Sequence, residues 1–387
     1  MTARDDSEGT SSAPVARTLT PRRRFMYLSI PYLILILLLG AIEVGTRLAL
    51  PHVTLLQALV STQQQQPSNF TDRERVTIFA GDPLLFWRLQ PKLDHVVWDF
   101  TLVSTNAQGL RHEGDIGRKH AGALRIVCLG DSVTFGYRVP VVWPERPKDY
   151  APDWLPYPML LEQRLRAANP GREIEVIALA VPGYTSYQGL LWLERDIAWL
   201  EPDVVTACFG WNDINLRAQP DRAVMPAGFA RVGFRRLMSY SQALTHLTLW
   251  LQRRKANDKS VRTPPATIPR VPQDEFVQNM LRIAQLSAAH GAQPILIAPV
   301  YRDATTDPPE AARIRAHRDA LRAAAQSANI PFLEIPELYE TNYPATQQLF
   351  GELIHPNHEG HRVMANALLR FFATHDTLKG FNVPPSL

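Results

Sequence analysis

Hydrophobic residues from position 125 onward fall into short runs that alternate with longer amphipathic segments. The runs are apolar and mostly rich in Val or Ile, as strands buried on both faces of a sheet are, and they cover 125–129, 174–180, 203–209, 294–299 and 331–335. Helical periodicity lies between and after them, at about 157–169, 185–200, 273–290, 308–328 and 357–374. Such alternation builds a parallel sheet covered by helices on both faces. The pattern predicts a three-layer α/β/α fold with a five-stranded parallel sheet.

Two further segments complete this α/β region. Residues 236–254 have helical spacing, and the proline-rich residues 255–272 after them predict a long surface loop. Upstream, residues 51–120 begin with a polar stretch at 61–69 that contains four consecutive Gln, and then pass through aromatic and turn residues. We expect a spacer followed by short strands that pack beside the α/β domain. Structural support is the simpler interpretation of this region, and ligand binding is the alternative.

A separate apolar run lies near the start of the chain. Residues 25–42 are eighteen residues without a charge, directly after Arg22–Arg24. A helix of this length spans roughly 27 Å of the ~30 Å hydrocarbon core of a bilayer. The arginines belong on the cytoplasmic side, which places the chain from residue 43 onward outside the cytoplasm, in the periplasm or at the cell surface. A cleaved signal peptide is one alternative, although its apolar region is usually shorter and residues 40–43 form a poor cleavage site; a buried helix of a soluble protein is the other.

Charge and cysteine content narrow the functional classes. Of the formal net charge of +4, residues 1–24 hold +2, from five Arg against three acidic residues, so the other 363 residues hold +2. That division suggests no concentrated basic face, and we expect no nucleic-acid partner. Two cysteines cannot build a disulfide framework or a Cys-rich zinc site. We therefore expect a cytoplasmic tail at 1–24, a membrane anchor at 25–42, a spacer with a small β-rich region at 43–120, and the α/β domain at 121–378.

Small and polar residues follow several predicted strands where those strands end. The first strand leads into Gly130-Asp131-Ser132, the second into Gly183, and the third into Gly210-Trp211-Asn212-Asp213; His355 follows the fifth. The carboxyl ends of strands in such sheets bind ligands. One face therefore collects a hydroxyl, a backbone N–H, an amide and an imidazole. Ester cleavage by a serine needs these groups as nucleophile, base and oxyanion donors.

These four segments resemble, in order and strand context, the four sequence blocks of the SGNH (GDSL-like) hydrolases, over roughly residues 124–374. The resemblance implies a flavodoxin-like sheet, with Ser132 as nucleophile and His355 as general base. It also implies an oxyanion hole made by the backbone N–H groups of Ser132 and Gly183 and the side-chain amide of Asn212. The chain has no Gly-x-Ser-x-Gly, so we do not expect the nucleophile elbow of α/β-hydrolases.

The acid of the implied triad departs from the family pattern. SGNH hydrolases usually carry Asp three residues before the histidine, and this chain has Glu352 there. One turn still presents carboxylate and imidazole to each other, but the additional methylene requires a bent rotamer or a shifted loop. We predict that Glu352 nevertheless acts as the triad acid. Asp131 and Asp213, in the same blocks, are assigned supporting roles.

Histidine spacing raises a metal site as an alternative. His355, His358 and His361 are three residues apart, but no other ligand cluster accompanies them, and Asn357 has the character of a helix cap. We expect neither a metal nor a cofactor.

The two cysteines should be neighbours in the core. Cys128 and Cys208 each stand four residues before a site residue, on strands that this fold places side by side. A disulfide between adjacent strands is usually strained, so we expect two buried thiols.

Three functions remain open at this stage. The leading one is an extracytoplasmic esterase that removes an acyl group, such as O-acetyl, from a glycan or another envelope component. An O-acyltransferase would use the same acyl-enzyme and pass the group to a sugar hydroxyl. The third is a glycan-binding protein without catalysis on the same scaffold. The sequence does not separate the first two, because both need the catalytic serine.

Overall fold

The computed structural model describes residues 20–60, 78–143, 150–256, 265–302, 309–339 and 348–385. Internal contacts divide the chain into two units, one of Met1–His52 with Ser241–Ala243 and one of Val53–Tyr240 with Leu244–Leu387. The smaller unit contains helix α1 (Pro21–Ala49), which has a mean hydropathy of 2.3 in its most apolar window and no buried residues there. Its length and composition suit a membrane span, and a signal sequence would pass the same test. Most of the predicted tail at 1–24 lies outside the described residues.

The larger unit is built on the predicted five-stranded sheet. The strands are all parallel in the order β11-β10-β7-β5-β6, which corresponds to the doubly wound order 2-1-3-4-5 read from the other edge. Their bounds are β5 (Leu124–Gly130), β6 (Ile174–Ala180), β7 (Val204–Cys208), β10 (Gln293–Ile297) and β11 (Phe332–Leu333). The edge strand β11 has two residues, fewer than the apolar run 331–335 predicts. The predicted fold class is confirmed.

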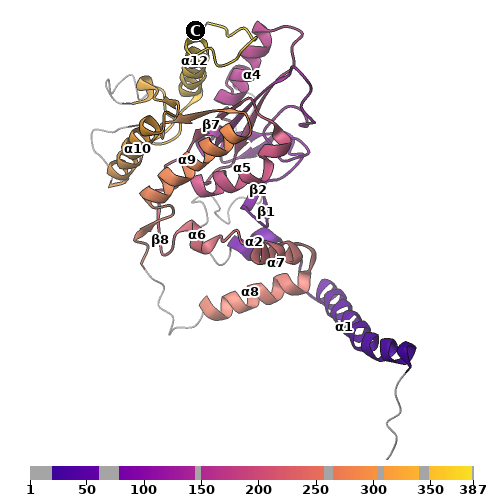
Figure 1. Ribbon diagram of the computed structural model, residues 1–387. Coiled ribbons are helices and arrows are strands. Elements are labelled where there is room, and N and C mark those ends of the chain that lie inside the picture. The colour runs from indigo at the N-terminus through magenta and orange to yellow at the C-terminus, as the bar shows by residue number, and fades with distance from the viewer. Residues whose placement is uncertain are drawn as a thin grey trace, which may run out of the picture. The chain divides into compact units, whose positions relative to one another are not determined.

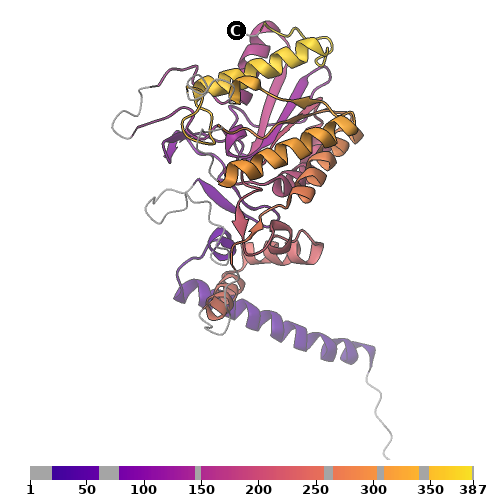
Figure 2. The same ribbon diagram turned by 90° about the vertical axis from the view of Figure 1, so that its left-hand side faces the viewer.

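Helices cover both faces of this sheet, which gives the three layers seen in Figures 1 and 2. On one face Val127 and Leu129 pack with α5 (Ser186–Leu200) and α9 (Gln273–Ala289), and α10 (Pro309–Ser327) lies against α9. On the other face Ile126 and Cys128 pack with α4 (Tyr157–Ala168) and α12 (His358–Thr374). These five helices match the predicted ranges within one residue at each end. The alternation along β5 buries both faces of the strand, as the apolar run 126–129 requires.

The predicted helix over 236–254 is wrong in its extent. Two helices occupy the segment, α7 (Phe229–Tyr240) and α8 (Gln242–Ala256), and the helical conformation is interrupted at Ser241. The backbone N–H groups of Gln242 and Ala243 donate to the carboxylate of Glu43 at 2.9 and 3.1 Å, so a distant side chain caps α8. A carboxylate at the start of a helix accepts from backbone N–H groups that have no partner within the helix, and it interacts favourably with the positive end of the helix dipole. The local sequence around residue 241 cannot predict this contact, because Glu43 is 199 positions away from Gln242 in the chain.

The proline-rich segment 255–272 is also more than a surface loop. Residues 257–264 lie outside the described residues, but β9 (Ile268–Pro269) pairs with β8 (Leu216–Arg217) next to the short helix α6 (Asp221–Val224). Arg270 and Val271 are buried. The end of this segment is therefore part of the domain.

The region before the sheet forms short strands, as predicted. It contains α2 (Leu55–Val60) and two antiparallel hairpins, β1 (Phe79–Asp82) with β2 (Phe86–Leu89) and β3 (Val96–Trp98) with β4 (Thr101–Val103). Phe79, Trp87 and Trp98 belong to the same hydrophobic core as β6 and α5. The predicted polar spacer at 61–69 lies outside the described residues. This region thus shares its core with the α/β domain.

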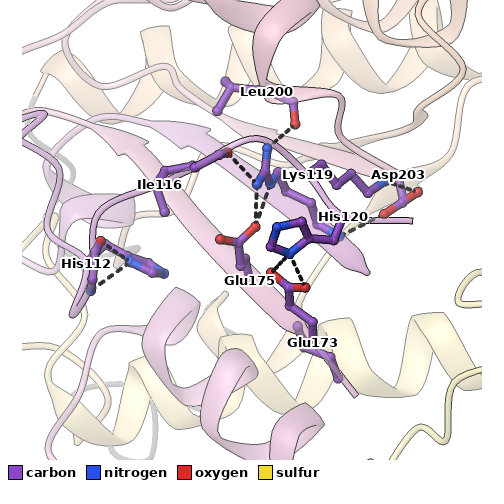
Figure 3. Close-up of polar contacts among 12 residues, drawn as sticks. His112, Ile116, Lys119, His120, Glu173, Glu175, Leu200 and Asp203 are labelled. Carbon is purple, nitrogen blue, oxygen red and sulfur yellow. Dashed lines mark hydrogen bonds and ion pairs between the residues drawn. The ribbon is translucent and has the colours of Figure 1, made fainter. Parts of the chain in front are cut away.

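A polar cluster fixes the amino-terminal edge of the sheet (Figure 3). The buried Arg125 side chain donates to Glu175 at 2.7 Å and to the carbonyl of Leu200 at 2.7 Å. Lys119 pairs with Asp203 at 2.6 Å in the same region, and a histidine–glutamate pair lies beside it. Buried charges require such partners. The cluster occupies the edge opposite to the strand ends that carry the site residues.

The cysteines lie on neighbouring strands, two residues out of register. Cys128 is opposite Thr206, and Gly130 is opposite Cys208. Strand spacing and rise then place the two Cα atoms about 8 Å apart. Both thiols are free and buried, and burial raises the pKa of Cys128 to about 12. The predicted pair of buried thiols is confirmed.

Candidate active site

Ser132 stands at the carboxyl end of β5, where the strand turns into the short helix α3 (Ser132–Phe135). The Asp131 carboxylate caps this helix by accepting from the backbone N–H of Val133 at 2.9 Å. Gly130 allows the turn, since a Cβ there would lie 2.0 Å from the hydroxyl of Thr134. As the first residue of α3, Ser132 has a backbone N–H with no intrahelical acceptor. Its half-buried hydroxyl and this N–H are both placed at the strand end.

His355 joins Ser132 to Glu352. Its Nε2 lies 2.8 Å from Oγ of Ser132, and its Nδ1 contacts Oε1 of Glu352. The imidazole is only 12% exposed, and the ring of Tyr137 packs on it with centroids 4.4 Å apart. This is the hydrogen-bonding order of a nucleophile–base–acid triad. The structure thus brings three of the predicted site residues into direct contact.

One closed turn carries both Glu352 and His355. The backbone N–H of Gly351 donates to the carbonyl of His355 at 3.0 Å, and an antiparallel bridge joins Phe350 to Pro356. Directly after the turn, Asn357 caps α12 by accepting from Gly360 N–H at 3.1 Å. Closing the loop in this way places the longer Glu side chain against the imidazole.

The surroundings of Glu352 favour its ionised form. Burial alone would raise the pKa of this carboxyl, but the hydrogen bond and charge of His355, the backbone N–H of Ile354 and the charge of Arg138 together lower it. Arg138 is itself held by an ion pair with Asp99 at 3.2 Å. Asp99 also accepts from the hydroxyl of Tyr137, the residue that packs on His355. The turn of the β3–β4 hairpin therefore connects to Glu352 through Asp99 and Arg138, and no motif in the sequence indicates this connection.

Asn212 is placed by Asp131. Its Nδ2 donates to Oδ2 of Asp131 at 3.2 Å. An amide NH₂ has two donors, so one N–H stays available for another acceptor. Burial raises the pKa of Asp131 to about 6, although the donors Val133 and Asn212 and the charge of His355 oppose the rise. Asp131 thus contacts both the start of α3 and the amide.

Gly183 lies in the turn after β6, with a φ of 85° that favours glycine. The carbonyl of Pro182 accepts from the indole N–H of Trp87 at 3.2 Å. In a trans peptide the N–H points opposite to the carbonyl, so the Gly183 N–H points away from Trp87. The carbonyl of Gly183 accepts from Arg270 at 2.8 Å. Trp87 and Arg270, which sequence reasoning did not single out, fix the two peptides on either side of this glycine.

Asp213 points to α5 and not to Ser132. It accepts from the backbone N–H and hydroxyl of Ser186 at 3.0 and 2.5 Å, and burial raises its pKa to about 7. Asn279 donates to the same hydroxyl at 3.1 Å. Asp213 therefore connects the loop after β7 to the start of α5.

The three spaced histidines have separate surroundings. His358 stacks on Trp154 with centroids 4.2 Å apart, and buried His361 accepts from the backbone N–H of Tyr157 at 3.1 Å. Burial lowers the pKa of His361 to about 3. Across the described ranges, no group of three or more His, Cys, Asp or Glu side chains is arranged to hold a metal ion.

Three comparisons with known proteins identify the family of this chain and similar structures. The family model of the GDSL-like lipase/acylhydrolase family matches residues 128–363. No curated protein sequence matches the chain. Solved structures similar to it include a catalytic mutant of Axe2, an acetylxylan esterase from Geobacillus stearothermophilus, with 19% identity, a TM-score of 0.43 and coverage of 70% of this chain and 100% of that one. A lipase/acylhydrolase from Enterococcus faecalis has 20% identity and a TM-score of 0.41, and covers 67% of this chain and 98% of its own.

Proposed function

Since this chain belongs to the GDSL-like lipase/acylhydrolase family, we propose that it cleaves acyl esters through an acyl-enzyme formed on Ser132. The observation that carries the proposal is the continuous contact from the Ser132 hydroxyl through His355 to Glu352. Two of these residues come from elements more than two hundred positions apart in the chain, so their meeting is a property of the fold.

The proposed reaction has two steps. Oγ of Ser132 attacks the ester carbonyl while Nε2 of His355 accepts its proton, and the tetrahedral intermediate then expels the alcohol, which takes that proton. Water attacks the acyl-enzyme in the second step, again with His355 as base, and releases the carboxylic acid and free Ser132. Glu352 stabilises the imidazolium in both steps and holds the tautomer that directs Nε2 to the serine.

The developing oxyanion needs preorganised donors. We assign this role to the backbone N–H groups of Ser132 and Gly183 and to the Asn212 amide. The contacts of Asp131 with the amide, and of Trp87 and Arg270 around Gly183, support the assignment because they fix the donors before substrate binds. Such fixed dipoles make the largest single contribution to the rate enhancement of many enzymes.

The substrate we propose is an acyl ester, such as an O-acetyl ester, on a glycan or another envelope component. Helix α1 supports an extracytoplasmic setting. Trp143 is 47% exposed and packs against Phe100, whose ring also contacts Arg138, the residue whose charge lowers the pKa of Glu352. An exposed aromatic side chain connected to the site in this way suits a ring-shaped substrate group.

A transfer assay tests this function. Purified full-length protein supplied with a simple acetyl ester should release acetate at the same rate with and without an added oligosaccharide. Acetylated oligosaccharide formed at the expense of free acetate would instead identify an O-acyltransferase. If a well-folded protein formed neither product from any acyl ester tried, a binding role without catalysis would replace the proposal.

The length and apolar composition of α1 lead to a separate prediction about where the protein is found. We expect the chain to stay in the membrane, because α1 is long and apolar enough to span it, with Arg22–Arg24 on the cytoplasmic side. Protease added to spheroplasts should then degrade the part after residue 50 while cytoplasmic marker proteins stay intact. Recovery of the protein in the soluble fraction, with an amino terminus beyond α1, would show instead that α1 is a cleaved signal.

A further inference from the structure

Helices α7 and α8 expose large apolar side chains. Phe229 is 96% exposed, and five others are about half exposed: Phe234 48%, Leu237 55%, Leu247 51%, Trp250 53% and Leu251 52%. Large contiguous apolar patches are uncommon on soluble monomers and mark sites of interaction with other molecules or membranes. We call these six residues the α7–α8 face.

Each helix has one packed side and one exposed side. On α8, Leu247, Trp250 and Leu251 are spaced i, i+3 and i+4, which places them on one stripe. The intervening Leu249 is buried, as is Thr245, whose hydroxyl donates to the carbonyl of Met238 on α7 at 2.8 Å. The exposed stripe is therefore the outer side of a helix pair whose inner side is packed.

The helix pair is also fixed to the domain. Arg235 of α7 is buried and donates to the carbonyls of Pro83 and Pro226 at 2.5 and 2.8 Å. Its guanidinium lies over the ring of Phe86, 4.7 Å from the centroid. These contacts anchor α7 on the β1–β2 hairpin, so the exposed side chains are presented by a packed helix.

The same segment concentrates positive charge. Residues 222–257 contain six Arg, one Lys and no Asp or Glu, a net of +7, whereas the whole chain has +4, which leaves −3 for the other 351 residues. The charge before and after residue 24 suggested no concentrated basic face, but residues 222–257 are strongly basic. Arg231, Arg236, Arg253 and Arg254 are exposed on the two helices. Cations mixed with exposed aromatic and leucine side chains are typical of helices that lie in the interface of an anionic membrane.

The length of the connecting segment limits how far α2 can lie from α1. Residues 50–54 are all that separates the end of α1 from α2, and α2 contacts α7. Five residues span at most about 18 Å when fully extended. A bilayer that holds α1 is therefore within reach of α2 and α7 by chain length alone.

We propose that the α7–α8 face docks on the surface of the bilayer that α1 anchors. The apolar side chains enter the interfacial region, and the exposed arginines contact the phosphates of anionic lipids. This inference rests on the proposed membrane anchor and not on the ester chemistry. Two attachments, one spanning and one interfacial, would restrict how the active site is oriented relative to the membrane, which a single flexible tether does not do.

Spin labels on the full-length protein in vesicles test the proposal. A nitroxide on Leu251→Cys reports on the α7–α8 face, one on Leu35→Cys reports on α1, and one on Ala373→Cys is the aqueous control. Ala373 is exposed on α12, at the other end of the larger unit from α7 in both views (Figures 1 and 2). The two native thiols are buried, so labelling is directed to the introduced cysteine.

In vesicles of phosphatidylcholine with phosphatidylglycerol, the label at 251 should be shielded from an aqueous nickel chelate, as the label at 35 is. We expect roughly tenfold to a hundredfold less access than at position 373, the partition that burial of one leucine side chain supports. Replacing Arg231, Arg236, Arg253 and Arg254 by Gln should restore access at 251, since each cation near an anionic surface contributes about fivefold to membrane affinity. Hydrolysis of a soluble ester should not change in this variant, which controls for folding.

Other outcomes would overturn the inference. Equal access at 251 and 373, with the label at 35 shielded, would mean that α1 spans the bilayer and the face does not dock. Dipolar broadening between labels at 251, increasing with protein density, would identify a second copy of the chain as the occupant. Exposure of the label at 35 would instead remove the anchor on which the inference depends, whether or not esterase activity is present.

Discussion

Replacing Ser132 by Ala should lower kcat for hydrolysis of a simple acetyl ester by about 10⁵ to 10⁶, the size of effect seen when a serine hydrolase loses its nucleophile. Without Oγ no acyl-enzyme forms, and only the oxyanion donors and the bound water remain to act on the ester. The residual rate should therefore be small but above that of the uncatalysed reaction.

Two controls give this result its meaning. Ser104→Ala removes an exposed serine whose hydroxyl accepts from the backbone N–H of His95 at 3.0 Å, and it should leave kcat unchanged. Near-ultraviolet circular dichroism of Ser132→Ala should match that of the wild type, because the side chain is half-buried at the start of α3 and not in the core. A Ser132→Ala protein that retained full activity would assign the nucleophile to another residue.

Glu352→Gln should lower kcat by roughly 10 to 10³, which overlaps the lower part of the ~10² to 10⁴ that a group in acid–base catalysis contributes. The amide keeps the shape of the side chain, but it removes the negative charge that stabilises the imidazolium and can hold the wrong tautomer of His355. Glu352→Asp should retain the activity of the wild type or increase it, because SGNH hydrolases usually carry aspartate at this position. The comparison of kcat among the three proteins at one pH is the measurement.

Glu310→Gln is the matched control for this series. Glu310 also pairs with a basic side chain, Arg313 at 2.9 Å, but on the surface of α10, where such pairs contribute little. Its kcat should equal that of the wild type. An unchanged kcat in well-folded Glu352→Gln would mean that another group orients His355, and the site would then be a Ser-His pair.

The layered fold was predictable because its signals are local. Mostly apolar runs such as 174–180 predict strands buried on both faces, and the five covering helices follow from periodicity. The register between strands was not predictable, because it depends on tertiary packing; Cys128 and Cys208 lie on the expected neighbouring strands but two residues out of register. The break at Ser241 was missed for a similar reason, since the cap of α8 is a residue almost two hundred positions earlier.

The candidate site divides in the same way. Ser132 and His355 were identified from motifs at strand ends, and the structure places them 2.8 Å apart. The residues that position the site carry no motif: Trp87 acts through one backbone carbonyl, and Arg138 acts through its charge near Glu352. A side chain that orients a peptide or tunes a carboxyl is visible only when the fold brings it there. This is why the β-rich region before the sheet has a role that its sequence did not indicate.

Covalent labelling of the full-length protein with a fluorophosphonate tests the central claim most directly. The probe reacts only with a serine that a neighbouring base activates, so mass spectrometry of the wild type should place the phosphonate on Ser132. His355→Ala should remove the labelling, because the hydroxyl then has no base within reach, while Ser104→Ala should label like the wild type. Phosphonate on a different serine, or equal labelling of wild type and Ser132→Ala, would contradict the account.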